Sequence, residues 1–422
     1  MKISTEFHRF GQLFRSLSVS KSGPLPGLCL TLAVTAVGQA VLFTMVPVIG
    51  ETTNIDLRGL SLVVALGILA FVVAAPLWGR ASDELGPRRV MLMGCGGVIL
   101  GQAGFALAIE LAARGYAGPD GTLTAMILFR VIHGAAAAAL FPVAQAWVAG
   151  VYDESERLSK FGALRLAMTI GRLAGPALAA GLTLLAALAP IHALVVFALL
   201  AFLAMSLCPE PAGTPQEHLD EIAPKPRARS AVRAFPLLLS VVVLLALMNG
   251  QLQFSIGLHA QTRLTLDAVQ ASQFVGLLMS LAAVAAILVQ VFVLRRLNER
   301  TFLALAVSGL LASSAVALVY WGWNWGSFAL AGVFVGASLA MAFPACAALL
   351  AASREPGHFG SAMGAFGSAQ TIGYALGAAL GGLYEIAPAV SFGVSFCAPL
   401  AAVVLASVSP ALRSPQMKPA GR

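Results

Sequence analysis

The chain has 422 residues, of which 59% are hydrophobic and only 10% are charged. Because a soluble domain carries about 25% charged residues, this composition excludes an ordinary soluble protein. The formal net charge is +8, and the position of the basic residues decides whether it reflects a nucleic-acid partner or membrane topology.

Apolar stretches long enough to cross a bilayer recur from one end of the chain to the other. Gly59–Trp78 and Val90–Ile109 each run twenty residues without a charge, the length that crosses about 30 Å of hydrocarbon. They predict an all-α membrane protein with twelve transmembrane helices, since the alternating residues of a membrane barrel do not appear. The predicted spans are 24–49, 59–79, 90–110, 122–150, 160–184, 187–208, 234–257, 268–294, 301–321, 326–352, 359–383 and 387–410.

The segments outside these spans divide the chain into two halves. Before the first span, apolar residues recur at helical spacing, which is typical of a helix lying on the membrane surface. After the sixth span, a stretch rich in proline and charge predicts a linker. The predicted organisation is an interfacial segment at 1–23, six-helix bundles at 24–208 and 234–410, a linker at 209–233 and a tail at 411–422.

The basic residues follow the predicted topology. With both ends in the cytoplasm, the cytoplasmic segments hold twenty of the 26 Lys and Arg residues, and the outer loops hold three. This asymmetry obeys the positive-inside rule for an even number of helices. It predicts a multi-pass protein of a bacterial-type inner (plasma) membrane with both termini cytoplasmic, and it excludes nucleic acid as a partner.

The two halves resemble each other in sequence. A shift of 202 residues brings two stretches of the first half onto the second without a gap. Parallel repeats of this kind place a substrate site between the halves, near the middle of the membrane. The identities are Gly134, Ala135, Phe141 and Pro142 with Gly336, Ala337, Phe343 and Pro344, and Gly162, Ala163, Thr169, Ile170, Gly171, Gly175 and Leu178 with Gly364, Ala365, Thr371, Ile372, Gly373, Gly377 and Leu380.

Between the second and third spans stands Gly79-Arg-Ala-Ser-Asp83-Glu-Leu-Gly86-Pro-Arg88-Arg89. We expect Gly79 to permit close helix approach, Gly86 to form a tight turn, and Asp83 to lie at a helix N-terminus. Arg88 and Arg89 are expected to bind lipid phosphates or a neighbouring carboxylate. The segment resembles the GxxxDxxGxRR loop of the major facilitator superfamily. That resemblance implies two six-helix bundles that rock around a central site.

Two further motifs bear on the direction of transport. Arg130-Val-Ile-His-Gly134 is similar to the family's RxxxG element, whose arginine is linked to proton coupling. Gly171-Arg-Leu-Ala-Gly175-Pro176 resembles the GxxxGP element of proton-driven exporters. Its small residues permit close helix packing, and its proline bends the helix. The family's following glycine pair is replaced by two alanines, so the match is imperfect.

Three arginines, Arg130, Arg165 and Arg172, lie within the predicted membrane spans without a carboxylate at the same depth. A cation near the bilayer centre costs about 2.5–3.5 kcal/mol on insertion scales, so such residues face a wet cavity, a carbonyl group or an anion. Arg130 and Arg172 are predicted at similar depths and form a candidate cationic ledge. Their repeat partners and that of Arg165 are uncharged: Gly332, Tyr374 and Gly367 respectively. The charge is therefore not a general requirement of the scaffold.

Other polar residues inside the spans complete the candidate site. Each of these residues also has a purely structural interpretation. The buried amides can form hydrogen bonds between helices, and Arg130 and Arg172 can bond to backbone carbonyl groups. The side chain of Arg165 can extend to the inner boundary of the membrane. The predicted substrate-binding residues are Arg130, Arg172, Arg165, Gln39, Gln251, Gln370 and Tyr374. The predicted proton-coupling residues are His133, Arg130 and Asp83, and the residues expected to serve conformational change are Gly79, Asp83, Gly86, Arg88, Arg89, Gly171, Gly175 and Pro176.

These features favour a proton-coupled exporter of a small anionic or polar metabolite or drug, a siderophore-like cargo included, that works as a monomer. The first span has Gln39 where many multidrug members have a carboxylate, which shifts the expected cargo away from cations. The alternatives are a broad multidrug/proton antiporter, a proton-linked importer of an organic anion, and a membrane sensor that does not transport. No enzyme, cofactor or metal site is indicated, since the five cysteines show no ligand spacing.

Overall fold

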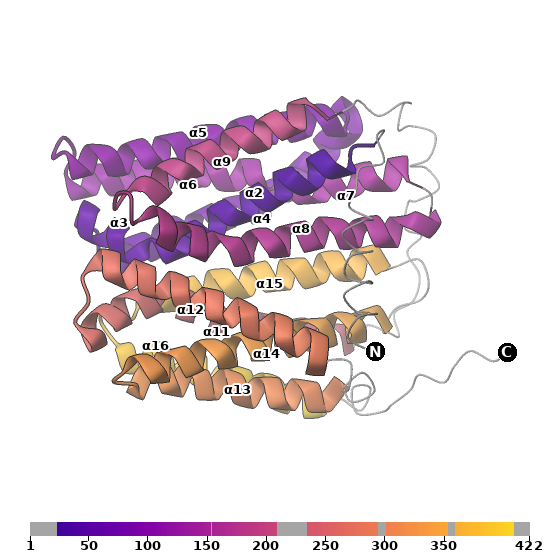
Figure 1. Cartoon of the computed structure of the whole chain (residues 1–422). Coiled ribbons are helices and arrows are strands. Elements are labelled where there is room, and N and C mark those ends of the chain that lie inside the picture. Colours follow the sequence, from indigo (N-terminus) through magenta and orange to yellow (C-terminus); the bar gives the residue numbers. More distant parts are fainter. Residues whose placement is uncertain (1–22, 153, 209–233, 294–300, 353–358, 409–422) are drawn as a thin grey trace, which may run out of the picture.

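The computed structural model describes residues 23–152, 154–208, 234–293, 301–352 and 359–408 of the chain (Figure 1). The predicted interfacial segment, linker and tail lie outside these residues, apart from Gly23. The first half contains α2 (Leu25–Thr44), α3 (Val46–Thr53), α4 (Leu57–Leu85), α5 (Pro87–Ala113), α6 (Pro119–Ala137), α7 (Leu140–Val151), α8 (Glu154–Leu182) and α9 (Ala189–Ser206). The second half contains α11 (Ala234–Leu264), α12 (Ala268–Leu288) with the π-helical turn η1 (Val289–Val293), α13 (Thr301–Trp321), α14 (Trp325–Ala352), α15 (Phe359–Gly382) and α16 (Pro388–Val408).

The helices run side by side, and the short turns that follow α3, α5, α8, α11, α13 and α15 lie at one end of the molecule, named here the hairpin side (Figure 1). The opposite end, where α2 begins and α16 ends, is named the terminus side. With α2 and α3 forming one span, α6 and α7 another, and α12 and η1 a third, the described helices make the predicted twelve spans. The predicted fold class is therefore confirmed.

Local sequence explains where helices begin at the hairpin side. Asp56 and Asp267 are the N-caps of α4 and α12, and their carboxylates accept hydrogen bonds from Gly59 N at 2.8 Å and Gln270 N at 2.7 Å. Proline stands in the first helical turn of α6, α9 and α16. Its missing N–H costs nothing there, because the first N–H groups of a helix have no partner within the helix.

Prolines also explain two interruptions that the predicted spans did not include. The first span breaks at Met45, two residues before Pro47, and the fourth breaks at Ala138 and Ala139, before Pro142. A proline removes one hydrogen bond and crowds the carbonyl group four residues earlier. Pro344, the repeat partner of Pro142, lies inside the uninterrupted α14, so the proline alone does not force a break.

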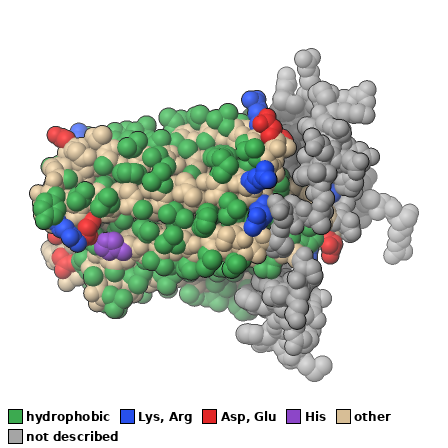
Figure 2. Space-filling model, turned by 90° about the horizontal axis from the view of Figure 1, so that it is seen from above, with side chains coloured by type: hydrophobic (Ala, Val, Ile, Leu, Met, Phe, Trp, Pro, Cys, Tyr) green, Lys and Arg blue, Asp and Glu red, His purple; other side chains and the backbone are tan. Residues whose placement is uncertain are grey.

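The outside of the molecule suits a bilayer. Ten helical segments are long and apolar enough to cross a membrane among the described residues. Figure 2 shows hydrophobic side chains along the flank, with the coloured charged side chains near the two ends. The two long helices outside the group of ten are α8 and α15, which are repeat-related. They contact α12 and α4 of the opposite half, so the more polar helices lie where the halves meet.

Glycines bring helices together in the same way in both halves. A Cβ added at Gly134 would collide with the carbonyl oxygen of Gly67, and one added at Gly336 would collide with that of Ala282. Gly171 and Gly175 pack in the same manner against the backbone of α2. The close packing predicted from the GxxxG elements is therefore found.

The segment between the second and third spans differs from the expectation in three respects. Helix α4 continues to Leu85, so only Gly86 is outside a helix, and it has the positive φ of 83° that a tight turn requires. Among the described residues, none lies within 4 Å of a Cβ added at Gly79, so the predicted close approach is not found there. No described carboxylate forms an ion pair with Arg88, which bonds to backbone carbonyl groups. Its guanidinium donates to the carbonyl oxygens of Ser206 at 2.9 Å and Cys208 at 3.1 Å, where α9 ends.

Candidate substrate site between the two halves

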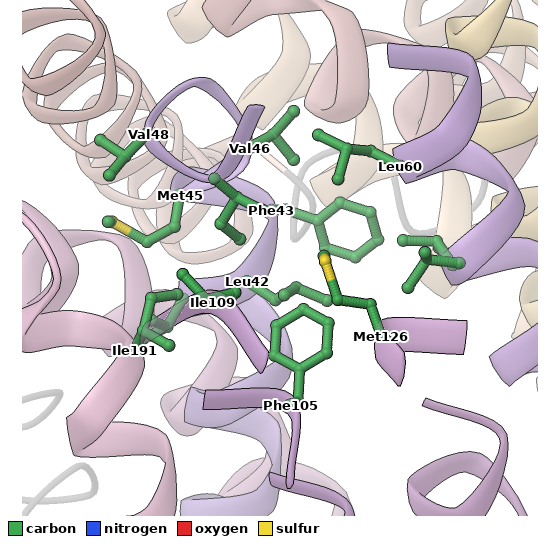
Figure 3. Close-up of a cluster of buried hydrophobic side chains, with 14 of the residues drawn as sticks. Leu42, Phe43, Met45, Val46, Val48, Leu60, Phe105, Ile109, Met126 and Ile191 are labelled. Atoms are coloured by element: carbon green, nitrogen blue, oxygen red, sulfur yellow. The ribbon is translucent and has the colours of Figure 1, made fainter. Parts of the chain in front are cut away.

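The halves are joined at the hairpin side by an apolar seal. Its largest hydrophobic cluster consists mainly of first-half residues, part of which Figure 3 shows, and it also includes Phe254, Ala268 and Ala378 of the second half. Phe43 of α2 meets Phe254 of α11 edge to face, with ring centroids 6.4 Å apart. Pro47 of α3 packs against Gly257 of α11. These apolar contacts join the two halves at the hairpin side.

Helix α8 presents one continuous face to the second half. Near the hairpin side, Pro176 and Ala180 pack against Gly276 of α12. Residues four apart share a helix face, so Arg172 continues this face one turn towards the terminus side, with Arg165 two turns further. Arg172 is exposed and interacts electrostatically with both Arg165 and Tyr374. Since Tyr374 belongs to α15, Arg172 points at the opposite half.

On the second half, Tyr374 belongs to a chain of hydrogen bonds between uncharged side chains. Gln253 Nε2 donates to Asn249 Oδ1 at 3.4 Å, and Asn249 Nδ2 donates to Tyr374 Oη at 2.6 Å. Because the phenol oxygen accepts from Asn249, its own proton remains to be donated. No described residue forms a hydrogen bond or ion pair with the Arg172 guanidinium group. The two facing side chains therefore both offer donors to a third group.

Arg165 lies between aromatic rings of both halves. Its guanidinium carbon is 5.6 Å from the ring centroid of Phe141 and 5.8 Å from that of Phe366. Such cation–π contacts stabilise a partly desolvated cation by about 0.5–2 kcal/mol. Gln370 stands on α15 between Phe366 and Tyr374, one turn from each. The α8 and α15 faces thus carry polar and aromatic side chains at the same levels.

Gln39 belongs to the same region between the halves. It is exposed on α2, one turn before Phe43, whose ring contacts the second half. Residues at i and i+4 share a face, so Gln39 also faces the second half. Five of the predicted substrate residues therefore lie where the halves face each other: Gln39, Arg165, Arg172, Gln370 and Tyr374.

The remaining predicted residues lie inside one half. Arg130 is 7% exposed, and its side chain packs against Gly67 of α4. Gln251 is fully buried, and its Nε2 donates to Ser255 Oγ at 2.9 Å and Ser391 Oγ at 3.0 Å. Arg172 interacts electrostatically with Arg165 and Tyr374. Its neighbouring arginine is therefore Arg165, whereas the predicted ledge combined Arg172 with Arg130.

The predicted proton-coupling residues stand on other helices than Arg172, on α4 and α6. His133 packs against Gly101 of α5 and interacts with the backbone of Val98. Asp83 is exposed near the terminus-side end of α4. Neither His133 nor Asp83 forms an ion pair with a described residue of α8 or α15.

Sequence reasoning missed Asn249, the residue that orients the Tyr374 hydroxyl group. The signal was present, since Asn249 and Gln253 are two amides four residues apart inside an apolar span. It also missed His259, which is buried near the hairpin side, with Nδ1 2.9 Å from Tyr384 Oη and Nε2 2.9 Å from the carbonyl oxygen of Val319. Its partners are about 60 and 125 residues away in the chain, so no local pattern indicated them.

Solved structures resemble the whole chain. A crystal structure of the human organic anion transporter MFSD10 has a TM-score of 0.64 and 19% identity, with 90% of this chain and 98% of that one covered. A bacterial homologue of the iron transporter ferroportin, in an inward-facing state, has a TM-score of 0.67 and 15% identity, with 90% and 97% covered. At these identities the likeness shows the fold alone.

Curated relatives match a shorter stretch. A triacylglyceride transporter of Mycolicibacterium smegmatis is 31% identical over 109 residues, 26% of this chain and 17% of its own length. A triacylglyceride transporter of Mycobacterium tuberculosis (strain H37Rv) is 30% identical over 121 residues, 29% of this chain and 22% of its own length. The alignment thus spans about a fifth of the length of these relatives.

Family membership rests on a broader match. The sequence model of the Major Facilitator Superfamily matches residues 28–378, which include the motif between the second and third spans and both halves of the repeat. Together with the two bundles of membrane-crossing helices, this match shows that the chain belongs to the Major Facilitator Superfamily of membrane transporters.

Proposed function

We propose that this protein exports a small organic anion with an apolar body by alternating access of one site to the two sides of the membrane. The observation that carries the proposal is the pair of donors that face each other across the halves, Arg172 and Tyr374. A guanidinium group and a phenol proton both favour a carboxylate or phosphate oxygen. An anion bound there would touch both halves at once.

The surroundings of Arg172 support an anion over a cation. Arg165 and Arg172 are close enough to repel each other, and no described carboxylate forms an ion pair with Arg172. A bound anion would relieve this repulsion in a region of low dielectric constant, where it is worth more than in water. The rings of Phe141 and Phe366 beside Arg165 offer an apolar surface for the rest of the cargo.

The direction, orientation and driving force rest on the sequence. The excess of basic residues supports a cytoplasmic terminus side in an inner membrane, and the motif Gly171–Pro176 supports export driven by protons. The sealed hairpin side then corresponds to an arrangement that receives cargo from the cytoplasm. His133 and Asp83 are the candidate proton carriers.

Everted membrane vesicles provide the test. The cargo candidates are anionic metabolites found in culture supernatants of cells with the protein and missing from those without it. When the lumen is made acidic, so that the proton gradient is directed outwards, vesicles with the wild-type protein should accumulate these metabolites. Arg172→Ala should abolish this accumulation, while Arg114→Ala, which removes an exposed arginine paired with Glu110 at the hairpin side, should not. Accumulation in right-side-out vesicles only would mean import, and accumulation of cations with Arg172→Ala fully active would overturn the anion proposal.

A lipid is the second candidate cargo, favoured by the local identity of 30–31% with proteins named triacylglyceride transporters. A neutral lipid has no charge for Arg172 to bind. Transfer of a labelled triacylglyceride between liposomes should then be independent of Arg172→Ala, whereas transport of an anion should be lost. The two candidates are separated by this one substitution.

A further inference from the structure

The turn that joins α15 to α16 contains a contact between the halves that the proposed site does not use. Glu385 Oε2 accepts a hydrogen bond of 3.0 Å from the backbone N–H of Leu57, the first residue of α4. Glu385 belongs to the second half and Leu57 to the first, 328 residues earlier in the chain. The bond therefore spans the boundary that must open when the hairpin side opens.

This bond completes the cap of α4. The first four N–H groups of a helix have no partner within the helix, and they attract negative charge. Asp56, the N-cap of α4, accepts from Gly59 N, which leaves the Leu57 N–H to Glu385. Beside this point α4 and α15 touch: a Cβ added at Gly382 would collide with the Ser61 side chain. Helix α4 is thus capped once by its own half and once by the other.

A buried histidine holds the residue next to Glu385. Tyr384 Oη is 2.9 Å from Nδ1 of His259, and Nε2 of His259 is 2.9 Å from the Val319 carbonyl oxygen. The imidazole ring is 2% exposed and packs against the rings of Tyr384, Phe392 and Phe328. Since both ring nitrogens are engaged within the second half, His259 fixes the turn from which Glu385 reaches across.

We propose that Glu385 is the latch of the hairpin side. Its carboxyl oxygen holds α4 of the opposite half when this side is closed, and His259 acts through Tyr384 as a positioning residue for it. The latch works as a hydrogen-bond acceptor for the Leu57 N–H, so an amide oxygen can replace the carboxylate, whereas a methyl group cannot. The inference rests on the alternating access in the proposed function, but it does not depend on which cargo is carried.

The opening of the hairpin side can be measured directly by electron–electron double resonance in lipid nanodiscs. Spin labels are attached at Tyr116→Cys, in the turn after α5, and Trp323→Cys, in the turn after α13, both of which are at least 75% exposed. The five native cysteines are replaced beforehand. No cargo and no proton gradient are present, so the distances report the latch even if the cargo assignment is wrong.

The expected result is a larger population of long distances in Glu385→Ala, with the ratio of open to closed protein raised about fivefold, or ~1 kcal/mol. Glu385→Gln should keep the wild-type distances, and Tyr384→Phe, which removes only the bond to His259, should open the side by a smaller factor. The matched control is Glu110→Ala, since Glu110 is a carboxylate of the same side whose partners Arg114 and His192 are in its own half. Unchanged distances in Glu385→Ala, or an equal change in Glu110→Ala, would overturn the latch.

Discussion

The two halves of this molecule share a scaffold but differ in the side chains at their common surface. Gly134 and Gly336 make the same close contact with a carbonyl oxygen, one in each half. At another pair of repeat positions, the first half has Arg172 and the second has Tyr374. The glycine pair that serves helix packing is identical in the two halves, whereas the pair that faces the other half differs.

The difference indicates how the work of binding is divided. The first half supplies positive charge on α8, and the second supplies a neutral hydroxyl group oriented by Asn249. Each half alone offers only some of the hydrogen-bond donors. A cargo bound by donors of both halves would therefore favour the arrangement in which the halves are close together. The predictions below test this division, from the largest expected effect to the smallest.

The charge of the first half should matter most. Arg172→Ala removes the two charge-assisted hydrogen bonds that its guanidinium group would donate to the proposed cargo. The apparent affinity for an anionic cargo should therefore weaken about 100-fold, or ~3 kcal/mol. Arg172→Lys keeps the charge but loses the planar fork, and should retain part of the affinity. Transport assays in everted vesicles measure both. Equal losses in Arg172→Ala and Arg114→Ala would show that the charge has no special role.

The shared scaffold should fail equally in the two halves. Gly134→Leu and Gly336→Leu each place a side chain against a backbone carbonyl group, at a cost of about 1–3 kcal/mol. Thermal unfolding in detergent should show similar decreases in midpoint for both. Gly96→Leu and Gly393→Leu are matched controls, because an added Cβ has nothing within 4 Å at either position. A decrease confined to one half would contradict the symmetric packing.

The hydroxyl group of the second half should have a smaller effect. Tyr374→Phe removes one neutral donor and leaves Asn249 with an unsatisfied amide, so the apparent affinity should fall about five- to tenfold, or ~1–1.4 kcal/mol. Asn249→Ala should have a similar effect, since it releases the hydroxyl group from its orientation. The measurement is the concentration dependence of transport. Full affinity in both variants would remove Tyr374 from the site.

The smallest effect concerns pH. Burial at the hairpin side, with Asp56 nearby, raises the pKa of Glu385 above its ordinary value of 4.5, although the Leu57 N–H and Arg58 oppose this shift. In the open arrangement water surrounds the carboxyl group and the pKa returns towards 4.5. Proton binding to Glu385 therefore favours the closed arrangement. The stability that this proton adds to the closed arrangement is complete below pH 4.5 and is lost as the pH rises through the raised pKa of Glu385.

We thus expect the labelled protein to close slightly more as the pH is lowered from 7 towards 5, by less than about threefold because Glu385 is exposed. Glu385→Gln, which has no charge to titrate, should abolish the dependence. The pH dependence of the distance distribution gives the answer. A shift towards the open arrangement on acidification would reverse the assigned sign.

Much of the architecture was predictable because it depends on local composition. Hydrophobic length marked the spans, and the observed helices agree with them to within a few residues at most ends. The breaks at Met45 and Ala138 were not predicted, although Pro47 and Pro142 stand beside them. Pro344 shows why: it lies inside the uninterrupted α14, so the presence of a proline does not by itself predict a break.

The candidate site was predicted in part. The sequence marked the intramembrane arginines and, through the repeat, showed that their charge is confined to one half. It did not separate Arg172, which faces the other half, from Arg130, which packs against Gly67 inside its own. Both stand in apolar helices, and a rotation of less than half a turn decides whether such a side chain faces a partner helix or the opposite half.

Composition and spacing by themselves determined that this protein lies in a membrane, that it has two related halves, and that the intramembrane arginines all belong to one of them. These properties depend on the free energy of single residues in hydrocarbon and on patterns along one helix. Tertiary structure alone decided the pairs: Arg172 with Tyr374, Arg165 with Phe366, and Glu385 with Leu57. Each pair joins residues about 200 or more positions apart, and only the packing of the two halves brings them within reach.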